Sequence, residues 1–190
     1  MEGKKELRIV YRRGTEDFAE YLQTLLEDRP GLETAVWTER DYLDCKGTMN
    51  GGEYVLFLGD GVALDREGVS IPKKFEQQGM TFGWAGRRAV IFATERPLDS
   101  KKKIKAFLEY IKSGYPEIGE DELAAVAEEN MMAWGESLKA TVNPFAMVLD
   151  SMFKKPVSSA GTITALGRLQ YKAAILHFLR DGIDEFLNGG

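Results

Sequence analysis

The sequence predicts a layered α/β fold, in which helices cover both faces of a mainly parallel sheet of about four strands. The runs Tyr54–Leu58 and Ala89–Ala93 are apolar throughout, which is typical of strands that are buried on both faces. Strand-like and helix-like patterns alternate over the first half of the chain, as they do in folds built from βαβ units. From about residue 121 only helical patterns follow, so we expect an all-helical C-terminal extension.

The first strand and the first helix have the clearest pattern in the chain. Leu7–Tyr11 is a short β-branched and aromatic run, and Thr15 follows it as a candidate N-cap before the acidic residue Glu16. Apolar residues then recur at the spacing of a helix that packs one face on a sheet: Phe18, Tyr21, Leu22, Leu25 and Leu26. The dipeptide Pro30-Gly31 ends this helix.

Three further strands complete the expected sheet. We place them at Thr34–Thr38, Tyr54–Leu58 and Ala89–Ala93, with a short crossover helix at Pro72–Gln78 and a longer helix at Ser100–Ser113. The two fully apolar runs favour parallel pairing, and parallel strands need crossovers. The expected strand order is therefore 2-1-3-4, with the first and third strands in the centre.

Helical patterns alone fill the rest of the chain. Apolar residues at helical spacing are Leu123, Ala127, Met131, Trp134 and Leu138, and further helices are expected at Phe145–Phe153 and Thr162–Leu187. This change of character divides the chain into an α/β domain of residues 1–118 and a helical extension of residues 119–190. The extension is expected to pack on the domain or to form an interface between copies of the chain.

Composition and charge exclude several classes of protein. The 190 residues are 44% hydrophobic and 29% charged, which is the balance of a globular domain with one full core and not of a disordered or collagen-like chain. The net charge of −5 argues against nucleic-acid binding, and the lysine run at residues 101–105 reads as a solvated helix face. Cys45 is the single cysteine, and no run of 18 apolar residues occurs, so we expect a cytoplasmic protein without disulfides or membrane spans.

The first candidate site follows the first strand. Arg12 and Arg13 come directly after that strand, and α/β folds bind ligands at the carboxyl ends of their strands. Guanidinium groups suit phosphate, although a solvent-exposed basic turn is the commoner explanation of such a pair. The three-glycine dinucleotide fingerprint is absent here, and only Gly14 and Thr15 fit the phosphate loop that a flavodoxin-like protein needs.

Other residues are candidates with ordinary structural alternatives. Asp60 follows the third strand, where it either faces a ligand or simply makes an Asp-Gly turn. Trp37 and Trp84 could stack on a nucleotide base, although buried packing is the commoner use of tryptophan. His177, the single histidine, has no second metal ligand near it in sequence, so we expect it to serve packing. The sequence predicts neither a metal site nor a bound cofactor.

Several stretches together resemble the Toll/interleukin-1 receptor (TIR) and TIR-like domain family. The first, from residue 8 to residue 43, reads RIVYRRGTEDFAEYLQTLLEDRPGLETAVWTERDYL. The others are EYVLFLGDG, similar to the family's third strand, and KKFEQQGMTFGWAGRRAVIFATERP, similar to a glutamate-bearing helix followed by a strand. The resemblance covers about residues 6–98, and nucleoside deoxyribosyltransferase-like and flavodoxin-like proteins share parts of it.

The resemblance implies cleavage of an N-glycosidic bond, usually that of NAD, by a glutamate on the helix after the third strand. Glu76 matches that glutamate, and a register shift of two would put Gln78 there instead. A carboxylate suits this chemistry because the departure of nicotinamide leaves an oxocarbenium-like cation. The family's serine and tryptophan-cysteine signature is replaced by GDGVALDREGVSIPKK. Glu39, which we expect in a turn after the second strand, is the natural neutral control.

Three functions from different classes therefore stand after the sequence analysis. The first is a TIR-like enzyme that hydrolyses NAD or a related small nucleotide, with Glu76 as catalyst and Arg12, Arg13, Trp37, Asp60 and Trp84 as substrate-binding residues. The second is a non-catalytic TIR-like signalling or scaffold protein that forms homo-oligomers through its C-terminal helices. The third is a flavodoxin-like binder of flavin or nucleotide, which a flavin absorption band would reveal.

Overall fold

The computed structural model describes residues 4–45, 51–59, 75–77, 80–93, 101–129 and 163–189, and of residues 75–77, 93 and 101 it describes the backbone only. The chain forms two compact units, one of Met1–Pro97 with Gln170–Gly190 and one of Leu98–Leu169. The sequence-based division had its boundary at residues 118 and 119 instead. The C-terminal residues from Gln170 onward thus belong with the sheet.

The first unit is built on one sheet of six strands in the order β2-β1-β3-β6-β5-β4. Its strands are β1 (Lys5–Tyr11), β2 (Leu32–Thr38), β3 (Tyr54–Leu58), β4 (Phe75–Gln77), β5 (Met80–Ala85) and β6 (Arg88–Ala93). The four strands expected from the sequence are β1, β2, β3 and β6, which are neighbours in the expected order and pair in parallel. The prediction of an α/β fold with a mainly parallel sheet is confirmed.

The remaining two strands correct the prediction. β5 pairs antiparallel with β6, and β4 pairs antiparallel with β5, so one edge of the sheet is antiparallel. The crossover helix expected at Pro72–Gln78 is wrong over residues 75–77, which form β4. Ala85 pairs with Arg88 across a two-residue turn in which Gly86 has a φ of 54°. Such a turn leaves no room for a crossover and forces antiparallel pairing.

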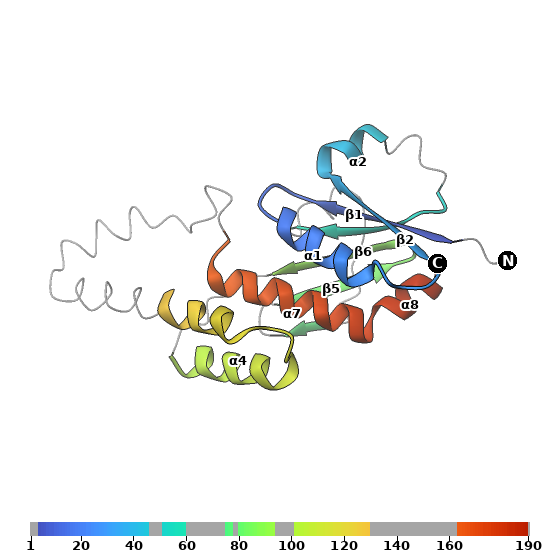
Figure 1. Ribbon diagram of the computed structural model, residues 1–190. Helices are drawn as coiled ribbons and strands as arrows, with labels where there is room; N and C mark the ends of the chain where they lie inside the picture. Colours follow the sequence, from blue (N-terminus) through green and yellow to red (C-terminus); the bar gives the residue numbers. More distant parts are fainter. Residues whose placement is uncertain are drawn as a thin grey trace. The chain divides into compact units, whose positions relative to one another are not determined.

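Three helices cover one face of the sheet, as Figure 1 shows: α1 (Glu16–Leu26), the part of α7 (Ala165–Asp181) that lies in this unit, and α8 (Ile183–Asn188). Aromatic pairs join the helices to one another and to the strands. The Phe18 and Tyr171 rings stack at 4.9 Å, and Phe178 lies edge-on to Phe82 of β5 at 5.6 Å. The helix expected at Thr162–Leu187 is interrupted at Gly182, where an added Cβ would lie 3.2 Å from the Phe82 ring.

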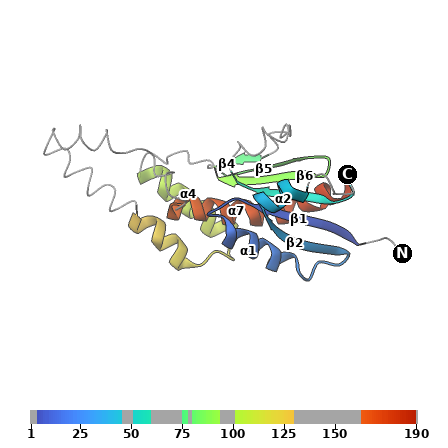
Figure 2. The ribbon, with the colours of Figure 1, turned by 90° about the horizontal axis from the view of Figure 1, so that it is seen from above.

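The opposite face carries α2 (Glu39–Cys45), which the sequence analysis read as a turn. Tyr42 of α2 is buried and lies edge-on to Phe57 of β3 at 5.1 Å. The helix begins with a capping box, because the Thr38 hydroxyl accepts from the Asp41 N–H and the Asp41 carboxylate accepts from the Thr38 N–H. The spacing from Thr38 to Asp41 was the sequence signal for this helix. Figure 2 looks onto this face, with β2 at one edge of the sheet and β4 at the other.

The C-terminal helix is fastened to the amino ends of the central strands. The Leu187 carbonyl accepts hydrogen bonds from Lys5 Nζ at 2.6 Å and from the Tyr54 hydroxyl at 2.7 Å. Arg29 pairs with Asp184 of the same helix. Because these contacts join both ends of the sequence to one sheet, the last residues complete the core of the α/β unit.

The second unit is helical where it is described. It contains α4 (Lys101–Gly114), which confirms the helix expected at residues 100–113, and a helix over residues 120–129. The start of α7 is capped by the Thr164 hydroxyl, which accepts from the Gly167 N–H, and by the Glu129 carboxylate, which accepts from the Ala165 N–H. The helix expected at residues 145–153 and the stripe residues from Met131 onward lie outside the described residues. In the described part of the chain, no helix is long and apolar enough to cross a membrane.

Two leucines of α1 give a matched test of this packing. Leu22 is fully buried against the sheet, whereas Leu25, three residues further along, is 42% exposed. We expect Leu22→Ala to lower the free energy of unfolding by about 2–5 kcal/mol, and Leu25→Ala to lower it by less than about 1 kcal/mol. Urea unfolding followed by circular dichroism measures both; equal losses would contradict the orientation of α1.

Candidate functional site

The candidate site lies where the direction of strand addition reverses. β2 lies on one side of β1 and β3 on the other, and the two connections carry helices on opposite faces, α1 after β1 and α2 after β2. At such a point the loops after the two central strands separate and leave room for a ligand. Here those loops begin with Arg12 after β1 and Gly59 after β3.

Arg12 and Gly59 are in direct proximity. The Arg12 N–H donates to the Leu58 carbonyl at 3.3 Å, and a Cβ placed on Gly59 would lie 4.0 Å from the Arg12 Cβ. Gly59 itself is buried, and its N–H donates to the Ile91 carbonyl of β6 at 3.3 Å. The carboxyl ends of β1 and β3, where the sequence predicted ligand-binding residues, therefore lie side by side.

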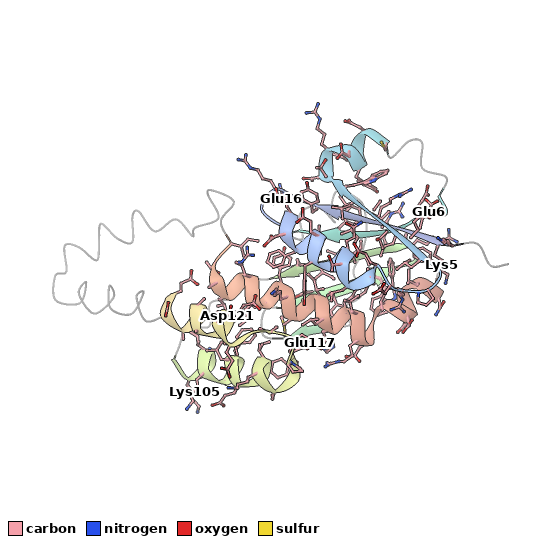
Figure 3. All side chains as sticks on the ribbon, viewed as in Figure 1. Lys5, Glu6, Glu16, Lys105, Glu117 and Asp121 are labelled. Atoms are coloured by element: carbon pink, nitrogen blue, oxygen red, sulfur yellow. The ribbon has the colours of Figure 1, made fainter. Side chains whose placement is uncertain are left out.

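The turn after β1 is closed by its own polar groups. The Thr15 hydroxyl donates to the Arg12 carbonyl at 2.8 Å, and the Gly14 N–H, at a φ of 95°, donates to the Glu16 carboxylate at 2.7 Å. Figure 3 labels Glu16 at this end of the sheet and Lys5 and Glu6 at the other. The Gly14 N–H is thus already taken by a carboxylate, and the cationic groups of this turn are the Arg12 and Arg13 side chains. Arg13 is exposed.

Glu39, which directly follows the neighbouring strand β2, also lies at this site. It is the first residue of α2, and its Oε2 lies 3.6 Å from Arg12 Nε, with the side chains 32% and 40% exposed, respectively. The sequence analysis placed Glu39 in a turn and treated it as a neutral control. Glu39→Gln was the intended control for Glu76→Gln, but because Glu39 lies beside Arg12 of the candidate site, another residue must serve as that control.

The capping box holds Glu39 in place. The Thr38 hydroxyl donates to Asp41 Oδ2 at 2.6 Å, and this bond, with the one from the Thr38 N–H, lowers the pKa of the Asp41 carboxyl below its ordinary value. The Asp41 carboxylate is therefore ionised at neutral pH and keeps the first turn of α2 closed. Glu39 lies between these two residues, so its backbone is fixed at the carboxyl end of β2.

A residue from the far end of the chain supports Gly59. The Tyr171 hydroxyl donates to the Gly59 carbonyl at 3.0 Å, and its buried ring stacks on Phe18 of α1. Tyr171 and Gly59 are 112 residues apart. No local pattern in the sequence indicates this contact, and the sequence analysis missed it.

The two candidate tryptophans occupy different environments. The Trp37 ring is partly buried, and the Arg8 guanidinium lies 5.0 Å from its centroid, so a neighbouring arginine covers it. Trp84 is only 8% exposed and packs against Phe82 and Phe178 in the core, with ring centroids 6.3 Å from each. Buried packing, the alternative given for both, describes Trp84 well.

Glu76 lies in β4 and not on a helix, which corrects the position that the family resemblance implied. Strand register places its backbone opposite Thr81, which pairs with Phe92, the residue after Ile91. Ile91 is level with Leu58, so the Glu76 backbone lies at the same edge of the sheet as Gly59. Asp60 and Gln78 lie outside the described residues.

The sheet order sets the separation between Glu76 and the basic turn. β4 is three strands from β3 and four from β1. At about 4.8 Å between neighbouring strands, these steps correspond to roughly 14 Å and 19 Å. The structure thus brings Arg12, Gly59 and Glu39 together. The backbone of Glu76 lies level with the carboxyl ends of β1 and β3 but several strands away.

His177 lies on α7 outside this site. Its ring centroid is 5.3 Å from that of Phe82, and its nitrogens face Arg180 Nη2 at 3.2 Å and Asp181 Oδ2 at 3.3 Å. Burial lowers the pKa of the imidazole below 6.5, although Asp181 acts in the opposite direction. The neutral ring packs on the sheet, in line with the packing role expected from the sequence.

A shallow groove occurs separately in the helical unit. It has a volume of about 410 Å³ and is lined by Lys105, Leu108, Glu109, Lys112, Glu120, Leu123 and Ala124. Lys105 pairs with Glu109 and Lys112 pairs with Glu120, so the charges along the groove neutralise one another. Within the described residues, no group of three His, Cys, Asp or Glu side chains could hold a metal ion.

In comparisons with known proteins, no family model, no curated protein and no solved structure matches the chain. The chemistry of the site must therefore be judged from its own residues.

The environment of His177 makes stability depend on pH in a defined direction. Because folding lowers the imidazole pKa, the unfolded chain binds the proton more readily, and stability falls as the pH drops below about 6.5. We expect His177→Gln to lose less stability than the wild type between about pH 7.5 and about pH 5.5. Urea unfolding at both pH values tests this; an equal loss in both proteins would show that the ring does not titrate with folding.

Proposed function

We propose that the chain binds a small nucleotide at the carboxyl edge of β1 and β3 and hydrolyses its N-glycosidic bond, with NAD as the first substrate to test. The observation that carries the binding part is the meeting of Arg12 and Gly59 where strand addition reverses. A guanidinium group at the carboxyl end of β1 suits a phosphate that approaches the end of the sheet.

The charge of the chain favours a small ligand over a nucleic acid. The net charge is −5, so a long polyphosphate would meet general repulsion. A single nucleotide needs only the local field of Arg12 and Arg13, which adjoin each other at the end of β1. The site therefore suits one or two phosphates.

Hydrolysis is the part of the proposal that comes from the TIR-like resemblance. Glu76 is the proposed carboxylate that stabilises the oxocarbenium-like cation as nicotinamide leaves. Its backbone lies at the same edge of the sheet as Gly59, but three strands away from β3. A nucleotide held at Arg12 must therefore extend along this edge to bring its glycosidic bond to Glu76.

Self-association without catalysis is the second candidate. The buried apolar residues of α7 and α8, such as Phe178 and Phe186, are already covered within one copy of the chain. An interface between copies would need other apolar surface, and Leu43 of α2 is 54% exposed. A scaffold role moves ahead if the chain proves inert toward nucleotides.

The binding part is tested through Arg12. We expect Arg12→Gln to weaken NAD binding about tenfold or more, because a charge-assisted hydrogen bond to phosphate is lost. Lys4→Gln is the control, since it removes the same charge from an exposed residue at the opposite end of β1. Isothermal titration of the full chain measures both, and equal affinities would remove Arg12 from the site.

The catalytic part is tested through Glu76. The wild type at micromolar concentration is expected to release nicotinamide from NAD, and Glu76→Gln is expected to abolish the release while NAD still binds. Glu33→Gln replaces Glu39→Gln as the control, because Glu33 is exposed at the amino end of β2. Chromatography of the products measures the release. Full turnover by the Glu76 variant would end the catalytic assignment and leave the binding proposal standing.

A further inference from the structure

Glu39 is the acidic residue at the carboxyl end of β2, next to the basic turn of β1. Its distance of 3.6 Å from Arg12 Nε is that of an ion pair and is too long for a hydrogen bond. In the described part of the structure, this contact is the interaction recorded for the Glu39 side chain. A carboxylate that is one-third exposed and held beside a nucleotide site can still accept hydrogen bonds.

The chemistry of such a carboxylate points to a sugar. Two vicinal hydroxyls can donate to its two oxygens, whereas a phosphate in their place would meet like charge. In Rossmann dinucleotide-binding folds an acidic residue after the glycine-rich turn binds the ribose 2′-hydroxyl. This chain lacks the glycine fingerprint, but Glu39 lies in a comparable place, at the end of the strand beside β1. We propose that Glu39 is the specificity residue of the site, selecting nucleotides with a free ribose 2′-hydroxyl and rejecting those with a 2′-phosphate. This inference rests on the proposed nucleotide site.

Two features keep Glu39 available for this role. The Thr38–Asp41 capping box fixes the backbone on both sides of it, so only the side chain of Glu39 has to be ordered when the ligand binds. The ion pair with Arg12 at 3.6 Å keeps the carboxylate close to the end of β1. When the carboxylate is removed, Arg12 loses this partner and becomes the nearest cation to a 2′-phosphate.

The test compares NAD with NADP on the full chain by isothermal titration. The wild type is expected to bind NAD at least about tenfold tighter than NADP, and Glu39→Gln is expected to reduce that ratio about tenfold, mainly through tighter NADP binding. Adding Arg12→Gln to Glu39→Gln should remove the gain for NADP. Glu33→Gln, with the same charge change at the opposite end of β2, should leave the ratio unchanged.

The possible outcomes separate the two proposals. If the wild type binds neither nucleotide, the proposed function fails and this inference fails with it. If NAD binds but the Glu39 variant keeps the wild-type ratio, the inference fails alone and the nucleotide site stands. A ratio that changes equally in Glu33→Gln would show a general charge effect and would also overturn the role of Glu39. Thermal unfolding of each variant checks that it is folded under the conditions of the titration.

Discussion

The burial of β3 on both faces is the constraint on which the rest of the structure depends. All five of its residues, Tyr54–Leu58, are buried, so the strand is stable only with neighbours on both sides and a layer on each face. β1 and β6 supply the neighbours. α1, α7 and α8 cover one face, where Tyr54 meets Phe186, and α2 contributes Tyr42 to the other, where it meets Phe57. The C-terminal helices are therefore part of the core of the α/β unit.

The same constraint creates the candidate site. Helices on both faces require connections that leave β1 and β2 in opposite directions, and the reversal lies beside β1 and β3, which are followed by Arg12 and Gly59. The connection after β2 also places the first residue of α2, Glu39, beside the basic turn. Arg12, the buried Gly59 and Glu39 thus come together as a consequence of the order in which the strands are added. Tyr171, from the C-terminal part of the chain, holds Gly59 in place through a hydrogen bond to its carbonyl.

The candidate site contains both basic and acidic side chains. Glu16 takes the backbone N–H of the turn after β1, and Glu39 partly neutralises Arg12. The site is therefore only moderately basic in a chain of net charge −5. This balance suits a small ligand with both phosphate and sugar groups better than it suits a free anion, because each charged group has a separate counterpart. Glu76 lies in β4, at the antiparallel edge of the sheet, and β4 is four strands away from β1, which Arg12 follows.

The sequence by itself determined the strands and helices whose apolar residues follow a regular pattern. The apolar runs fixed β3 and β6, the stripe from Phe18 to Leu26 fixed α1, and the four strands found in this way have the expected order and direction. That Arg12 and Arg13 lie at the carboxyl end of β1 could also be predicted, because their place in a strand-helix turn is a local property. The capping box from Thr38 to Asp41 was also readable, although it was read as a turn.

Only the tertiary structure decided what depends on contacts between distant residues. Whether residues 75–77 form a helix or a strand depends on the hairpin of β5 and β6, which offers an edge for pairing, and not on local propensity. The pairing of Glu39 with Arg12 depends on α2 packing over the sheet, and the hydrogen bond from Tyr171 to Gly59 spans 112 residues. A sequence pattern records the period of one segment. The partner that a side chain meets is set by how the segments pack, because burying all the apolar faces at once fixes which ends lie together.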